Sequence, residues 1–188
     1  MADSQAKILK YCAKNVAFDG WTEKLLRNAS ISTGLDENYW RIIYPNGVMD
    51  AADAYVDQAN ENMAVGLVLS KMRTTEKVAA LIKNRLTQHA ADKPAIRASL
   101  AAYTLHPIRG LQASYRSVDA IWRIAGDTAT DWNFYTKRGL LAAVYWATLA
   151  FWLEDKSAGH ADTWKFLDAR LSNVASFGKF VGKIKKAI

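Results

Sequence analysis

The stretch from Leu140 to Leu153, Leu-Leu-Ala-Ala-Val-Tyr-Trp-Ala-Thr-Leu-Ala-Phe-Trp-Leu, decides how this chain must fold. It runs for fourteen residues without a charged residue, proline, glycine or asparagine. A transmembrane helix needs about 20 apolar residues and a typical strand has about 5–6, so the stretch fits neither. Its alanine and leucine content favours a helix, which we expect to span Trp132 to Glu154 after Thr130 or Asp131 as N-cap. A helix that is apolar on every side must be wrapped by other helices or contact lipid.

The composition of the 188 residues, 51% of them hydrophobic, fits a single globular domain. The single cysteine, Cys12, excludes an internal disulfide and a zinc site built from cysteines, which suits a reducing compartment. The formal net charge is +7, and its distribution is uneven. The first fifty residues carry six basic and six acidic side chains, whereas five basic residues and no acidic one follow Asp168. The excess positive charge therefore gathers in the C-terminal tail.

Apolar residues recur at helical spacing along the rest of the chain, and no stretch alternates with period two. The predicted architecture is therefore all-α, with about nine to ten helices. Asp36 is expected to cap the third helix, and the residues from Ile108 to Gly110 to form a connection before the seventh. The expected helices span about residues 4–16, 22–29, 36–44, 49–71, 74–89, 94–106, 114–125 and 132–154, with a last one from 163 onward.

The first three expected helices are short, and a glycine-bearing turn separates the second from the third, which is the outline of a helix-turn-helix. We expect a helix-turn-helix-like part over residues 1–48, a helical bundle over 49–175 and an amphipathic tail over 176–188. The would-be recognition helix begins Asp36-Glu37-Asn38 and offers Arg41 as its one cation. Because lysine and arginine contacts to phosphates supply most non-specific DNA affinity, this segment predicts the shape without DNA binding.

No constellation of residues predicts catalysis or a metal centre. A di-iron bundle needs Glu-x-x-His on two helices, and the residues three places after the five glutamates are Leu, Trp, Ala, Ala and Ser. The three histidines, His89, His106 and His160, are not clustered, and no glycine-rich phosphate loop occurs in the sequence. We therefore predict a protein that is not an enzyme, with no catalytic residue, no metal and no cofactor.

The apolar stretch has two interpretations. A buried core helix would suffice for many bundles. However, aromatic side chains on several faces of one helix are hard to bury in a small domain without a cavity, which favours a lipid or isoprenoid pocket. The residues assigned to this lipid site are Trp122, Leu140, Leu141, Val144, Tyr145, Trp146, Leu149 and Trp152.

The tail also has two interpretations. Its apolar residues step by three or four and lysines fill much of the remainder, so it could dock on its own domain or lie in a membrane interface. The lack of an acidic residue after Asp168 favours an anionic membrane surface. The residues assigned to membrane binding are Phe177, Lys179, Phe180, Val181, Lys183, Ile184, Lys185, Lys186 and Ile188.

Three blocks together resemble one protein family. They read Val-Asp-Ala-Ile-Trp-Arg-Ile-Ala-Gly-Asp at 118–127, Asp-Trp-Asn-Phe-Tyr-Thr-Lys-Arg at 131–138 with Leu-Leu-Ala-Ala-Val-Tyr at 140–145, and Asp-Thr-Trp-Lys-Phe-Leu at 162–167. These blocks are similar to the family of the ninth accessory protein of coenzyme Q biosynthesis. The resemblance implies a fold like that of TetR regulators without their DNA function. It also implies binding of lipids, including isoprenoid quinone intermediates, and assistance to the di-iron hydroxylase that acts on demethoxyubiquinone.

The resemblance also implies a surface that faces the hydroxylase. The matching positions are Asp119, Ile121, Asp131, Phe134 and Tyr135, and Phe134 stands where some members of the family have a tryptophan. A phenylalanine keeps an aromatic anchor there but loses the indole N–H donor.

The prediction is thus an all-α, TetR-like accessory protein of ubiquinone biosynthesis that presents an isoprenoid quinone intermediate to the hydroxylase at a membrane. Its expected partners are that quinone or a phospholipid, the hydroxylase, the membrane surface and a second copy in a homodimer, but no nucleic acid. The beginning of the chain has Asp3 and no arginine before Arg27, which argues against a mitochondrial transit peptide. We expect a bacterial protein on the cytoplasmic face of the inner membrane, or a processed form on the matrix side of the mitochondrial inner membrane. Two alternatives are a TetR-type ligand-responsive transcription regulator and a membrane-surface scaffold without a pocket.

Overall fold

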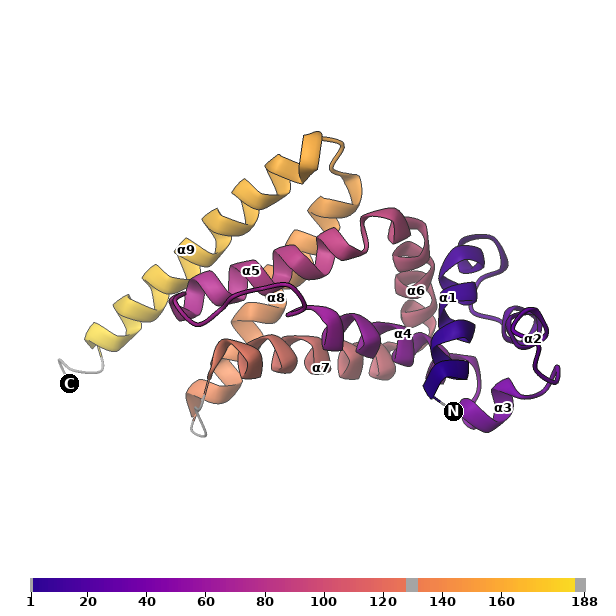
Figure 1. The fold of residues 1–188 in the computed structure, drawn as a ribbon. Coiled ribbons are helices and arrows are strands. Elements are labelled where there is room, and N and C mark those ends of the chain that lie inside the picture. Colours follow the sequence, from indigo (N-terminus) through magenta and orange to yellow (C-terminus); the bar gives the residue numbers. More distant parts are fainter. Residues whose placement is uncertain (1, 128–131, 185–188) are drawn as a thin grey trace. The chain divides into compact units, whose positions relative to one another are not determined.

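The computed structural model describes residues 2–127 and 132–184, and within these residues every regular element is a helix (Figure 1). This confirms the all-α prediction. The α-helices are α1 (Ala2–Asp19), α2 (Glu23–Ser32), α3 (Trp40–Ile43), α4 (Val48–Asn62), α5 (Thr74–Gln88), α6 (Lys93–Leu105), α7 (Pro107–Ala125), α8 (Trp132–Glu154) and α9 (Ala161–Ile184). Two short 3-10 turns, η1 (Ala90–Asp92) and η2 (Ala158–His160), precede α6 and α9.

Several helix ends lie where local chemistry predicts them. The span of α8 is the predicted one, and the Thr22 hydroxyl accepts a hydrogen bond of 3.2 Å from the Leu25 amide as the N-cap of α2. Gly126 follows the last residue of α7 with a φ of +89°, the left-handed conformation that glycine adopts most readily after a helix.

The predicted extension of α4 to Lys71 is wrong, because the helix ends at Asn62. The chain turns there through Gly66, which has a φ of +81°. The side-chain amide of Asn84 donates hydrogen bonds of 3.0 Å to the carbonyls of Met63 and Val65. A contact from α5 thus fixes a turn that the helical spacing of the apolar residues does not reveal.

Two further boundaries correct the predictions. α7 begins at Pro107, so the residues predicted as a connection form its first turn, where proline is favoured. Gly110 lies so close to α6 that a Cβ there would be 3.1 Å from the Tyr103 Cβ. α3 spans a single turn after Tyr39, and the Asp36 carboxylate accepts a hydrogen bond from the Asn38 amide in the preceding turn instead of capping the helix.

The chain divides into two compact units. Unit 1 comprises residues 1–62 and 89–117, and unit 2 comprises residues 63–88 and 118–188. Unit 1 contains ten basic and ten acidic residues, whereas unit 2 contains fifteen basic and eight acidic ones. The whole formal charge of +7 therefore belongs to unit 2. The functional division predicted at residues 48 and 175 stays a prediction.

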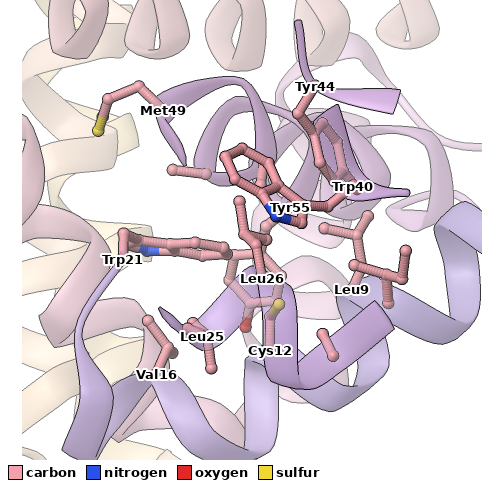
Figure 2. Packing of buried hydrophobic residues seen from close by; sticks show 14 of the residues in the cluster. Leu9, Cys12, Val16, Trp21, Leu25, Leu26, Trp40, Tyr44, Met49 and Tyr55 are labelled. Atoms are coloured by element: carbon pink, nitrogen blue, oxygen red, sulfur yellow. The ribbon is translucent and has the colours of Figure 1, made fainter. Parts of the chain in front are cut away.

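The core of unit 1 is aromatic. Figure 2 shows Trp21, Trp40 and Tyr55 gathered around Leu26, with Tyr44 beside Trp40. Trp40 and Leu26 are 1% and 0% exposed, and the Trp21 indole N–H donates a hydrogen bond of 2.9 Å to the Ser99 hydroxyl. Because the buried indole nitrogen has this partner, the large ring is buried without an unsatisfied polar group.

Ion pairs join α4 to α7 within unit 1. Arg109 lies 2.6 Å from Asp50 and 3.4 Å from Asp53, and Arg116 lies 3.2 Å from Asp53 and 2.9 Å from Asp57. The three aspartates are spaced by three and four residues, so they share one face of α4. Unit 1 thus balances its charges internally.

One carboxylate of this network titrates at low pH. Burial raises the pKa of Asp50, but hydrogen bonds from Arg109 and Asn46 together outweigh this effect and leave the pKa below its ordinary value of 3.8.

Unit 2 contains α5, α8, α9 and the last turns of α7. The Asp155 carboxylate stabilises the beginning of α9 by accepting hydrogen bonds from the Thr163 amide and hydroxyl at 2.9 and 2.5 Å, and one from the Ser157 amide at 2.7 Å. These bonds, chiefly the one from the Thr163 hydroxyl, hold the pKa of Asp155 well below its usual range.

Candidate lipid and partner surface

The helix α8 has one buried and one exposed face, although both are apolar. The inner face is buried at positions that recur every three or four residues: Leu141, Val144, Tyr145, Thr148, Leu149, Trp152 and Leu153. The exposed positions are Ala143, Trp146, Ala147, Ala150 and Phe151. Other described helices therefore do not wrap α8 on every side, which leaves the second possibility, contact of its outer face with lipid. Composition could not distinguish the faces, because neither contains charged residues between Leu140 and Leu153.

The inner face contains one polar contact that sequence reasoning missed. The Arg85 guanidinium, 7% exposed, donates a hydrogen bond of 2.6 Å to the Tyr145 hydroxyl and lies 5.5 Å from the centroid of its ring. A buried arginine must have partners, because an isolated charge is costly to remove from water. Arg85 occurs on the apolar stripe of α5 beside Ile82 and Leu86. The one signal in the sequence is that a basic residue occupies a position where the helical spacing predicts an apolar one.

The outer face of α8 ends in an aromatic stack with α9. The rings of Phe151 and Phe166 lie parallel, with their centroids 4.8 Å apart and an interplanar angle of 11°. The Arg170 guanidinium covers the Phe166 ring at 4.6 Å. Phe151 is nevertheless 40% exposed and Trp146 37% exposed, so this face presents two large aromatic side chains to its surroundings.

The residues predicted to bind lipid therefore fall into three groups. Leu141, Val144, Tyr145, Leu149 and Trp152 are buried on the inner face, Leu140 and Trp122 are half-buried, and Trp146 is exposed. The Trp122 indole donates a hydrogen bond of 3.2 Å to the Lys137 carbonyl, and the Lys137 ammonium lies 5.6 Å from its ring centroid. The described conformation is thus closed on the inner face and accessible on the outer face.

A buried arginine, which sequence reasoning also missed, organises the residues predicted to face the hydroxylase. Arg138 is 5% exposed and pairs with Asp119 at 2.8 Å and with Asp127 at 3.3 Å. Its guanidinium also lies 3.4 Å from the centroid of the Phe134 ring. Asp119 is held by Arg123 as well, at 3.0 Å. These contacts fix the end of α7 and the first turns of α8 against each other.

The predicted partner residues differ in accessibility. Tyr135 is 68% exposed and its ring meets that of Phe134 edge-on, with centroids 5.2 Å apart. Ile121 is completely buried in the core, so it does not contribute to a surface in this conformation. Asp131 lies outside the described residues.

The predicted membrane residues fall at the end of the chain. Lys185, Lys186 and Ile188 lie outside the described residues. For the others, namely Phe177, Lys179, Phe180, Val181, Lys183 and Ile184, the structure describes the helical backbone of α9.

Comparison with known proteins confirms the family resemblance. The family model described as COQ9 matches residues 108–178. A probable mitochondrial ubiquinone biosynthesis protein coq9 of Dictyostelium discoideum is 31% identical over 196 residues, which cover 97% of this chain and 63% of that protein. The mitochondrial ubiquinone biosynthesis protein COQ9 of Homo sapiens is 27% identical over 195 residues, covering 96% of this chain and 60% of that one. The chain is thus similar to proteins of the COQ9 family over nearly its whole length. It spans about three fifths of the length of these relatives. The residues that the family model matches include α7, α8 and most of α9, the helices that form the surface described above.

The fold of the chain is like that of TetR regulators. The crystal structure of a TetR transcriptional regulator from Nitrosomonas europaea ATCC 19718 superposes with a TM-score of 0.71, covering 91% of this chain and 97% of that one. The sequences are 19% identical, so the likeness concerns the fold alone.

The helix-turn-helix part of the chain has little cationic surface on α3. Trp40 is buried, and the Arg41 guanidinium pairs with Glu23 at 2.8 Å while lying 4.4 Å from the centroid of the Trp40 ring. The cation in the would-be recognition helix is thus engaged within unit 1.

Three further properties of the described residues bear on possible sites. Unit 1 has a surface groove of about 370 Å³, with a largely polar lining formed by Gln5, Ile43, Tyr44, Asp50, Asp53, Ala54, Asp57 and Arg116. Residues 2–127 and 132–184 contain no group of three or more histidine, cysteine, aspartate or glutamate side chains that could hold a metal ion. None of the helices in these two ranges is both long enough and apolar enough to cross a membrane.

Proposed function

We propose that the chain is a non-catalytic lipid-binding protein of ubiquinone biosynthesis, which presents an isoprenoid quinone intermediate to a di-iron hydroxylase at a membrane. Similarity to ubiquinone biosynthesis proteins over 97% of the chain supports the pathway. The observation that carries lipid binding is the exposed apolar face of α8, where Trp146 and Phe151 remain accessible.

The lipid would lie along α8. Removing apolar surface from water contributes about 25 cal/mol per Å², so two exposed aromatic side chains offer a substantial driving force for binding an isoprenoid chain. Trp146 would make the first contact, and the inner-face residues would form the wall of the pocket once the ligand has entered. The Arg85–Tyr145 pair would supply polar groups for a quinone oxygen at this wall.

The hydroxylase would bind at the beginning of α8. Tyr135 is an exposed aromatic residue there, and the buried pairs of Arg138 hold the neighbouring Phe134 in place. Exposed aromatic residues on a rigid support are typical centres of protein–protein interfaces.

A matched pair of variants tests this interface. Tyr135→Ala should weaken co-purification with the demethoxyubiquinone hydroxylase at least about tenfold, since a central aromatic residue contributes about 2 kcal/mol or more. Tyr115→Ala, which truncates an exposed tyrosine of unit 1, should leave the association unchanged. Equal binding by both variants would place the interface elsewhere.

The membrane would be bound through the tail from residue 176 onward, on the cytoplasmic face of a bacterial inner membrane or the matrix side of a mitochondrial one. Deletion of residues 176–188 should therefore abolish sedimentation with anionic vesicles and leave the rest of the chain folded. A truncated chain that still binds such vesicles equally well would contradict the role of the tail as the membrane anchor.

The proposal also includes a homodimer of the chain. Sedimentation equilibrium, which measures the molar mass of the assembly in solution, tests it.

The proposal as a whole is tested by reconstitution. Demethoxyubiquinone in anionic vesicles should be hydroxylated faster by the hydroxylase when the chain is added, and the chain alone should convert none. No acceleration, or conversion by the chain alone, would overturn the accessory role.

A further inference from the structure

We propose that the loop between α4 and α5, residues 63–73, is a second membrane-contacting element. It would insert Val65 and Val68 into the interface of an anionic bilayer and place Lys71 at the level of the lipid phosphates. This inference rests on the proposed membrane location, but it concerns a segment distant in sequence from the tail.

The loop is rich in apolar residues, and several of their side chains are exposed instead of buried in the core. Residues 64–69 read Ala-Val-Gly-Leu-Val-Leu, yet Val65 is 64% exposed, Val68 77% and, further on, Met72 36%. Isolated exposed apolar residues are common on protein surfaces. Val65, Val68 and Met72, however, lie within eight residues of one loop, and we call them the loop patch; such concentrations of exposed apolar surface mark binding sites.

The loop presents this patch in a fixed conformation. The Asn84 side chain holds the carbonyls of Met63 and Val65 at its beginning. At its end, the Glu76 carboxylate accepts hydrogen bonds from the Arg73 amide and guanidinium at 2.8 and 3.0 Å. These contacts hold both ends of the loop, so less conformational entropy is lost when its apolar residues enter a lipid interface.

Charge complementarity selects an anionic bilayer as the occupant. Residues 63–88 contain five basic residues and one acidic residue, Glu76, within a unit of formal charge +7. Lys71 is exposed directly beside Met72, whereas the exposed Arg73 pairs with Glu76. Apolar side chains flanked by lysine and arginine match the layered chemistry of a membrane interface, where phosphates lie above the acyl chains.

The position of the loop in unit 2 agrees with this assignment. α5 and α9 pack together, and the Lys83 ammonium lies 5.4 Å from the centroid of the Trp164 ring, near the beginning of α9. The two helices run in opposite directions, so the beginning of α5 lies toward the later turns of α9 (Figure 1). The loop therefore lies at the end of unit 2 where α9 leads into the proposed tail anchor.

The native chain is well suited to a site-specific label. Its single cysteine, Cys12, is completely buried, and burial raises the pKa of its thiol to about 12, so the thiolate that reacts with labels is scarce. A Val68→Cys variant of the full chain can therefore be labelled with a polarity-sensitive fluorophore. Ile42→Cys is the matched control, because Ile42 is 67% exposed but belongs to unit 1.

Both labelled proteins are mixed with vesicles of equal parts phosphatidylcholine and phosphatidylglycerol, and sedimentation reports binding separately. The label at position 68 should shift to shorter wavelength and become shielded from iodide, whereas the label at position 42 should not change. Combined substitution Val65→Ser and Val68→Ser should weaken vesicle binding about tenfold, since two partly inserted valines are lost.

The outcomes separate this inference from the proposed function. If the chain sediments with the vesicles while the label at position 68 stays in water, the loop inference is wrong and the tail anchor stands. If the chain does not sediment with them, the proposed membrane location fails and the loop inference fails with it. If position 68 becomes shielded without vesicles as the protein concentration rises, a second copy covers the loop and the inference is also overturned.

Discussion

The two units of the molecule differ in how they balance charge. Unit 1 has equal numbers of basic and acidic residues, pairs its α4 aspartates with α7 arginines, and buries Trp40 and Tyr44 almost completely. Unit 2 holds the whole excess of positive charge and leaves Trp146 and Val68 substantially exposed. A unit whose charges are balanced internally serves the fold, whereas unbalanced charge points to ligands and partners. From this difference in charge we infer that the proposed lipid and membrane contacts lie in unit 2.

The largest expected difference between the units concerns their tryptophans. Trp40→Ala should lower the free energy of unfolding by about 3–5 kcal/mol, because it removes a buried ring from the core of unit 1. Trp146→Ala should lower it by less than about 1 kcal/mol, since that side chain is 37% exposed, but should weaken lipid binding. Urea unfolding of both variants measures the difference. A stability loss of similar size in both would mean that α8 is an ordinary core helix.

A second comparison concerns two arginines that pair with the same aspartate. Arg138→Met should destabilise the protein by about 3 kcal/mol, because it removes the buried guanidinium that Asp119 and Asp127 share and leaves them with the more exposed Arg123 and Lys137 as their ion-pair partners. Arg123→Met, whose side chain is 70% exposed, should cost less than about 1 kcal/mol. Denaturant titration checks both values. If Arg138→Met is neutral in stability yet abolishes hydroxylase binding, the arginine contacts the partner directly.

The ion pairs of unit 1 predict a smaller, pH-dependent effect. Because the pKa of Asp50 is lower in the folded protein than its ordinary value of 3.8, its contribution is fully present above that value and is lost as the pH falls below it. Asp50→Asn should reduce this loss of stability between pH 5 and pH 2 (roughly the range in which a paired aspartate titrates). Thermal unfolding at a series of pH values measures it, and identical pH profiles for the two proteins would contradict the pairing.

The smallest effect is expected where unit 1 itself exposes apolar residues. Leu105, Ile108 and Leu111 are 73–79% exposed at the junction of α6 and α7. The nearby Arg109 and Arg116 pair with aspartates of α4, so their charges are balanced within unit 1. Ile108→Ser should therefore change binding to anionic vesicles less than about twofold. A loss comparable with that of the tail deletion would move the membrane site to unit 1.

Local chemistry was sufficient to predict much of the fold. The N-cap at Thr22, the glycine after α7 and the uncharged run of α8 each act through neighbours in sequence, so the corresponding helix boundaries could be predicted. The end of α4 at Asn62 could not, because it depends on Asn84, some twenty residues away.

The candidate site was predictable only in part. The apolar run and the family resemblance both indicated α8 and the turn before it. Which face of α8 is buried could not be predicted, because a uniformly apolar helix shows no periodicity in its sequence. The roles of Arg85 and Arg138 were missed because a buried arginine becomes recognisable only once its tertiary partners, here Tyr145 and two aspartates, are located.

Native mass spectrometry of the gently purified chain tests the central claim most directly, with extraction of any bound lipid to identify it. The account predicts a retained phospholipid or isoprenoid quinone whose occupancy falls in Trp146→Ala at unchanged melting temperature. A chain that carries no lipid after purification, and takes up none from quinone-containing vesicles, would contradict it.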